Sequence, residues 1–61
     1  MTQDVINNKC DIITRCLKRI REKTPSTAEI LADDVDAQDI ISVNLQRAIQ
    51  AAVDIASHLI S

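Results

Sequence analysis

The polar side chains best suited to chemistry lie near the C-terminus, along one border of a predicted helix. At about 100° per residue, four of them fall within about 80° of azimuth: Asn44, Arg47, Asp54 and His58. Asp54 and His58 are four residues apart, so they can pair on the helix surface, which would favour the charged imidazole. This polar column could bind phosphate or position a catalytic group. It could also form the polar seam of a helix bundle, with Arg47 paired to an acid on a neighbouring helix.

Other residue patterns that carry catalysis are missing from the sequence. It has no Ser-His-Asp arrangement, no P-loop and no paired-carboxylate motif, and nothing in it builds a sheltered cleft around its single histidine, His58. Cys10 and Cys16 are separated by about 9 Å of rise on a helix, too far to form a disulfide within it. We therefore predict no catalytic residue, no metal site and no cofactor. The two thiols are expected to be free, which favours a reducing cytoplasm.

Length and composition restrict the fold class. The chain has 61 residues, of which 46% are hydrophobic, and it contains no aromatic residue, no glycine and one proline. This composition favours an all-α chain and excludes glycine-rich phosphate loops and base stacking on aromatic rings. The longest apolar run is three residues, and no secretory signal begins the sequence. We therefore expect a small helical protein of the cytoplasm that does not enter a membrane.

The net charge of −2 conceals a strong segregation of charge along the chain. Residues 1 to 23 carry six basic and three acidic side chains, a net +3, whereas residues 24 to 43 carry five acidic side chains and no basic one. The basic end of the first helix could attract phosphates. Alternatively, it is a solvated helix end whose cations are favoured by the helix dipole.

A first helix is predicted from about residue 3 to residue 23. Its apolar residues recur at spacings of four and three: Ile6, Cys10, Ile13, Leu17 and Ile20. Thr2 or Asp4 can cap its N-terminus. Thr24 and Pro25 are expected to end it, because a residue that precedes proline is disfavoured in the α conformation.

A short helical turn is predicted next, at about residues 27 to 32, because Ser26 and Glu29 have the spacing of a capping box. Residues 33 to 36 form an acidic loop, in which Asp36 is the expected cap of the following helix.

The second long helix, at about residues 37 to 60, is apolar over about 200° of its circumference. A helix with so wide an apolar arc cannot be buried by a single partner, so two antiparallel helices would leave a large patch exposed. Further helices are needed, from a second copy of the chain or from C-terminal sequence that is missing. The residues predicted to face this oligomer or bundle interface are Ile6, Ile13, Leu17, Ile20, Ile41, Leu45, Ala48, Ala52, Ile55 and Leu59.

Both predicted helices follow the residue pattern of a known family. The matching positions are Asp4 to Ile6, Asn8 and Lys9, the block from Arg15 to Ile20, Gln38 and Asp39, Asn44 to Ala48, and Asp54 to Ala56 followed by His58. Because helical periodicity alone produces matches at apolar positions, the informative ones are polar: Asn44, Gln46, Arg47, Asp54 and His58. In these residues the chain resembles HepT-like proteins of the HEPN superfamily, which are prokaryotic helical ribonuclease toxins. The resemblance covers nearly all 61 residues.

The resemblance implies a helical bundle that forms a homodimer and is neutralised by a minimal nucleotidyltransferase antitoxin encoded beside it. Full-length relatives cleave RNA without metal, through an Arg, four intervening residues, a His, one residue and a Tyr on a later helix, and the antitoxin modifies that Tyr with AMP. This chain has no Tyr, and no His lies five residues after any Arg. The family's catalytic residues therefore have no counterpart here. What carries over is the scaffold role of both helices and an accessory role for Asn44, Arg47 and Asp54.

Three hypotheses of function follow. In the first, the chain is a truncated or partial HepT-like toxin of a prokaryotic toxin-antitoxin system, inactive alone, with RNA as a partner only at full length. In the second, it is a stand-alone helical dimerisation or protein-interaction module without enzymatic activity. The third is nucleic-acid binding through the basic end of the first helix, which the net acidity and the lack of aromatic residues oppose.

Overall fold

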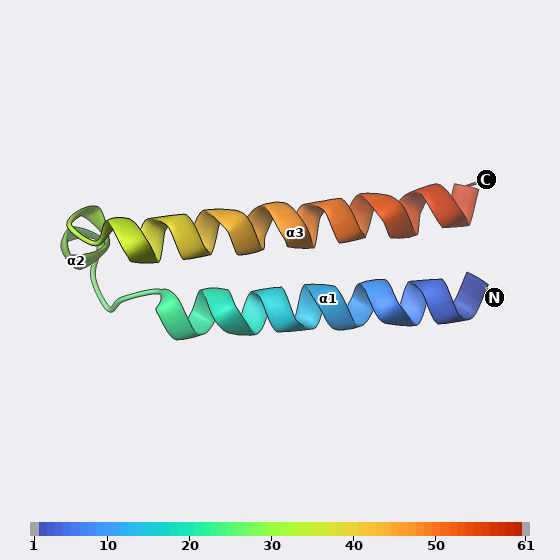
Figure 1. Ribbon diagram of the computed structural model, residues 1–61, viewed down its shortest axis with the longest axis horizontal. Coiled ribbons are helices and arrows are strands. Elements are labelled where there is room, and N and C mark those ends of the chain that lie inside the picture. The colour runs from blue at the N-terminus through green and yellow to red at the C-terminus, as the bar shows by residue number, and fades with distance from the viewer. Residues whose placement is uncertain (1, 61) are drawn as a thin grey trace.

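The computed structural model describes residues 2–60 and consists of two long antiparallel helices and one short one. The helices are α1 (Thr2–Lys23), α2 (Ala28–Ala32) and α3 (Val35–Ile60). α1 and α3 run side by side along the 44 Å length of the molecule, and α2 lies at the end where the chain turns back (Figure 1). The predicted all-α fold is therefore confirmed. Over the described residues, we find no helix long and apolar enough to cross a membrane.

Helix α1 ends at Lys23, as predicted from the threonine and proline that follow. Both the backbone N–H and the side-chain hydroxyl of Thr24 donate to the carbonyl of Ile20, at 2.9 and 2.6 Å. At the other end, Thr2 is already helical, so the capping position lies outside the described residues. Asp4 stands inside the first turn, where its carboxylate is favoured by the helix dipole.

The predicted caps of the other two helices are each displaced. The cap of α2 is Thr27, whose hydroxyl accepts from the N–H of Ile30 at 3.2 Å; Ser26 was expected in that position. Helix α3 starts at Val35, two residues before the predicted start, because the carboxylate of Asp34 accepts from the N–H of Ala37 at 3.0 Å. Asp36, the predicted cap, lies in the first turn instead.

The turn end is held by one glutamine as well as by these caps. The side-chain amide of Gln38, near the start of α3, donates to the carbonyls of Leu31 and Ala32 at 2.8 and 3.1 Å. These carbonyls belong to the last turn of α2, where helical carbonyls lack intrahelical partners. Gln38 therefore fixes α2 against the start of α3.

The seam between α1 and α3 is made mainly of small side chains. α3 buries Ala37, Ala48 and Ala51 along with Asn44, and α1 buries Cys16. Ala51 is the most buried of them, with 3% of its surface exposed. Small side chains allow two helices to approach closely. The core of the hairpin is thus a narrow line of contact rather than a layer of large side chains.

The residues predicted for the interface divide into two groups in the hairpin. Ala48 is buried and five others are partly covered: Ile6, Ile13, Ile20, Ile41 and Ile55. Four are exposed: Leu17, Leu45, Ala52 and Leu59. Helix α1 thus covers only one side of the wide apolar arc of α3, as the width of that arc implies. The contact of the exposed four with a further helix stays a prediction.

Candidate functional site

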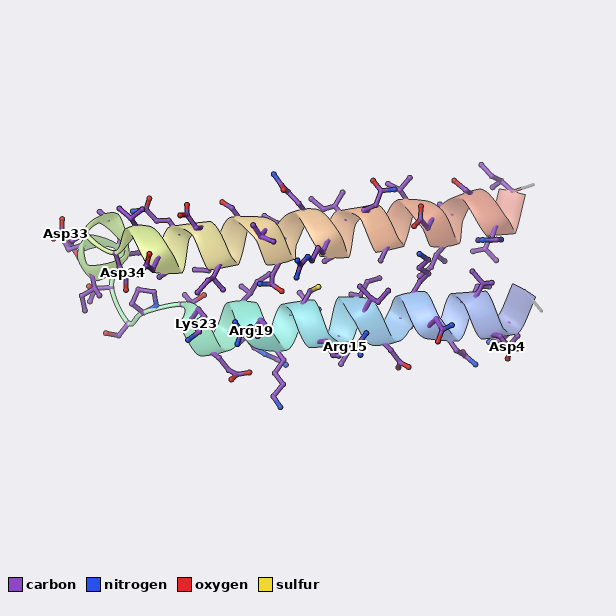
Figure 2. The ribbon with its side chains drawn as sticks, viewed as in Figure 1. Asp4, Arg15, Arg19, Lys23, Asp33 and Asp34 are labelled. Carbon is purple, nitrogen blue, oxygen red and sulfur yellow. The ribbon has the colours of Figure 1, made fainter. Side chains whose placement is uncertain are left out.

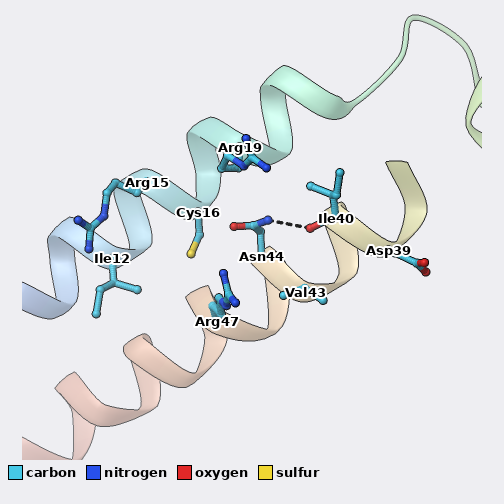
Figure 3. A pocket seen from close by; sticks show the side chains of 9 residues that line it. All are labelled: Ile12, Arg15, Cys16, Arg19, Asp39, Ile40, Val43, Asn44 and Arg47. Carbon is cyan, nitrogen blue, oxygen red and sulfur yellow. Dashed lines mark hydrogen bonds between the residues drawn. The ribbon is translucent and has the colours of Figure 1, made fainter. Parts of the chain in front are cut away.

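Asn44 lies at the centre of the α1–α3 seam, and only 7% of its surface is exposed. Its side-chain amide donates to the carbonyl of Ile40, one turn earlier, at 2.8 Å (Figure 3). This hydrogen bond offsets the cost of burying a polar side chain. Asn44 is therefore a packed member of the seam that also faces the open groove described next.

A groove of about 600 Å³ runs along one side of the seam. Its lining from α1 is Ile12, Arg15, Cys16 and Arg19, and its lining from α3 is Asp39, Ile40, Val43, Asn44 and Arg47. Figure 3 shows Arg47 reaching from α3 towards α1 beside Cys16, while Asp39 lies at the edge, away from the arginines. Three arginines, two from α1 and one from α3, thus line the groove. We call it the arginine groove.

The arginine groove is positively charged. Its lining holds three arginines and one carboxylate, a net +2. Among residues 2–60 the ion pair found joins Lys9 to Asp54, so no described carboxylate lies within 4.0 Å of any of the three guanidinium groups. Arg47 has no acid partner on α1 within the described residues, and its pairing with an acid on a helix outside this hairpin stays a prediction. The acids instead gather towards the α2 end, where Figure 2 shows Asp33 and Asp34.

Asp54 belongs to a separate polar cluster, farther along α3. Its carboxylate forms an ion pair with Lys9 of α1, with the Nζ and Oδ2 atoms 3.0 Å apart, and accepts from the side-chain amide of Gln50 at 3.0 Å. The hydrogen bond from Lys9, and then that from Gln50, hold the pKa of Asp54 below its ordinary value.

His58 lies beside this cluster rather than in direct contact with Asp54. It is exposed and lines a shallow hollow with Lys9, Asp54 and Ser57. In the described part of the chain, Asp54 is hydrogen-bonded to Lys9 and Gln50, and no hydrogen bond joins it to His58. The carboxylate is instead paired with Lys9 of α1, and His58 acts on Asp54 only through its charge, which contributes to the lowered pKa of that carboxyl.

The predicted polar column thus divides between two places. Asn44 and Arg47 line the arginine groove, whereas Asp54 and His58 belong to the cluster with Lys9. Sequence reasoning missed the contribution of α1 to the groove, made by Arg15 and Arg19. The available signal was their spacing of four residues on one border of the apolar stripe of α1, but nothing indicated which border of α3 would lie beside it.

Comparison with known proteins agrees with the resemblance stated from the residues. The chain is 39% identical over 56 residues to the mRNA nuclease HepT of Shewanella oneidensis. The matched segment covers 92% of this chain and 41% of that protein, so the chain spans about two fifths of the length of its relative. No model of a protein family matches the chain, and no solved structure matches it. The resemblance to HepT-like proteins is thereby confirmed, and it extends over nearly the whole length of the chain.

Proposed function

We propose that this chain supplies two scaffold helices of a HepT-like ribonuclease toxin and does not cleave RNA alone. The observation that carries the proposal is the 39% identity to a HepT described as an mRNA nuclease. The chain lacks the tyrosine of the family's catalytic motif and has no histidine five residues after an arginine. In this proposal the whole protein acts on RNA in the prokaryotic cytoplasm and is neutralised by a nucleotidyltransferase antitoxin.

The scaffold in this proposal is completed by a second copy of the chain. Three large apolar side chains of α3 support it: Leu45, Ile49 and Leu59 are 49%, 56% and 68% exposed. With Val53 they lie within about 120° of azimuth, on the side of α3 that α1 does not cover. We call these four residues the apolar face. A repeated stripe of this kind on a long helix is suited to the self-complementary contact of a symmetric dimer.

A chimera tests the scaffold role. The segment of the Shewanella oneidensis HepT that matches this chain is replaced by the chain, and RNA cleavage by the chimera is measured in the presence of a chelator. We expect cleavage comparable to that of the parent HepT, because the catalytic motif is left intact on a compatible scaffold. A folded chimera without activity would contradict the proposed scaffold role.

The isolated chain gives the complementary test. Incubated with the same RNA, it is expected to leave the RNA intact, and the His58→Ala variant is expected to behave identically. Metal-independent cleavage by the chain that His58→Ala abolishes would overturn the proposal, because His58 would then be a catalytic residue.

The apolar face also supports a second candidate function, that of a stand-alone dimerisation module. The two candidates differ in the chimera experiment, since a module unrelated to a toxin scaffold would not restore cleavage. They agree that the chain self-associates, which is tested separately below.

A further inference from the structure

The three arginines of the arginine groove do not contribute to the stability of the hairpin through ion pairs. Within residues 2–60, none of Arg15, Arg19 and Arg47 has a carboxylate oxygen within 4.0 Å. Arg15 and Arg19 are four residues apart on α1, and like charges at this spacing destabilise a helix by about 0.2–0.5 kcal/mol. Hairpin stability therefore gives no reason for placing these three charges together.

The shape and lining of the groove suit a charged ligand group. Its volume of about 600 Å³ falls within the range of sites that take small ligands. Its walls are partly apolar, through Ile12 and Val43, and its arginines are exposed to solvent and accessible to a ligand. Guanidinium groups bind phosphate through pairs of parallel hydrogen bonds. Three of them around one groove are chemically matched to a phosphate ester.

We propose that Arg15, Arg19 and Arg47 form a binding site for the phosphate backbone of an RNA strand. The choice of RNA rests on the function proposed above, whereas the choice of phosphate rests on the groove itself. Because the chain has no aromatic residue, the bases cannot stack on a ring, and the contact is made to the backbone without regard to base identity. The site thus holds and positions the strand and takes no part in its cleavage.

Charge elsewhere on the hairpin is mixed at both ends of the groove, since Arg21 and Lys23 end α1 beside α2. Five acidic side chains lie between residues 24 and 43, and Figure 2 shows Asp33 and Asp34 at the α2 end. They repel a phosphate backbone that approaches from that end. In the other direction a second hollow shares Arg15 with the groove and continues along α1 to Lys9 and Asp11, where Lys9 is paired with Asp54. Because acids and bases are mixed at both ends, the proposed site is confined to the arginine groove itself.

The test is the binding of a short fluorescein-labelled oligoribonucleotide to the chain, followed by anisotropy over a series of NaCl concentrations. The triple variant R15A/R19A/R47A is compared with K18A/R21A/K23A, which removes the same number of charges from exposed positions of α1 outside the groove. For a single strand, each phosphate contact makes the slope of log K against log[salt] more negative by about 0.7. We expect the slope for the groove variant to be less negative than that for the unchanged chain by about 2, and the slope for the control to change by less than half of that.

Three outcomes would overturn the proposal. The first is the absence of RNA binding by the unchanged chain at low salt. The second is equal weakening in both triple variants, which would show a diffuse positive field. The third is that a short polyglutamate peptide displaces the labelled RNA as effectively as an unlabelled oligoribonucleotide does. That result would indicate a site for acidic protein surfaces.

Three further measurements keep the result interpretable. Circular dichroism shows whether each variant remains helical. The variant R15K/R19K/R47K keeps the charges but loses the planar guanidinium groups, so we expect it to bind RNA more weakly than the unchanged chain. In the unchanged chain, the Nε–Hε resonances of the three groove arginines should shift on addition of RNA while that of Arg21 does not; a uniform shift of all four would contradict the site. A negative result here refutes the groove alone, because the chimera tests the scaffold by cleavage.

Discussion

Replacing Leu45 and Ile49 together by lysine should dissociate the proposed dimer. Complete burial of a leucine or isoleucine side chain contributes about 1.5–3 kcal/mol, and about half of each of these two side chains is already covered within the hairpin. Covering the remaining half contributes about 1 kcal/mol per residue, or about 4 kcal/mol for the four side chains of two copies. At 1.4 kcal/mol per factor of ten, the loss is about a thousandfold in the dissociation constant. The lysine charges add a desolvation cost to this figure.

The assay is light scattering coupled to size-exclusion chromatography over a series of protein concentrations. The unchanged chain should have twice its formula mass of 6.7 kDa, and the double-lysine variant should have the mass of one chain. The matched control replaces Asn7 and Thr14, two exposed residues of α1 away from the apolar face, by lysine, and it should remain a dimer. A folded monomer for the unchanged chain would refute the reasoning. So would a double-lysine variant that associates as tightly as the control.

Three further predictions concern the hairpin itself. Because the pKa of Asp54 in the folded chain lies below its ordinary value of 3.8, its contribution to stability should be complete above pH 3.8 and be lost as the pH falls through the folded-state pKa. Urea unfolding at a series of acidic pH values should show this loss of stability, and the Asp54→Asn variant should show a smaller one. Ala51→Leu should lower the free energy of unfolding by about 1–3 kcal/mol, because the side chain is buried against α1, and urea unfolding of the exposed neighbour variant Ala52→Leu should show no such loss. Thr27→Ala should cost about 1 kcal/mol by thermal unfolding, whereas Ser26→Ala should cost almost nothing, because only Thr27 caps α2; equal losses would contradict that capping assignment.

The elements of the fold follow from the sequence because they depend on local signals. The alternating spacings of apolar residues predict both long helices, and Pro25 predicts where α1 ends. The caps do not follow from the sequence, because Ser26 and Thr27 are adjacent and can each accept a capping hydrogen bond. The same holds for the several acids that precede α3. In the structure the hydroxyl of Thr27 and the carboxylate of Asp34 accept the capping hydrogen bonds.

The site was less predictable, because it depends on how two helices pack. Arg47 and Arg15 are far apart in the sequence, and they line one groove only because α3 turns Asn44 and Ala48 towards α1. From the sequence, α1 was expected to contact the centre of the apolar arc of α3, so that Leu45 would face α1. The hairpin instead contacts along the edge of that arc, where alanines allow closer approach. Periodicity gives the width of an apolar arc but not which part of it a given neighbour covers.

The alanines of the seam have a consequence for the width of the arginine groove. An alanine side chain has no rotatable heavy-atom bond, so it cannot change conformation to accommodate a different distance between the two backbones. The spacing of α1 and α3 is therefore set by methyl contacts at Ala48 and Ala51, and with it the distance across which Arg47 faces the arginines of α1. A single larger residue in the seam would widen the groove without touching any of its charges. The size of the anion that the groove accepts is thus encoded in residues that never meet it.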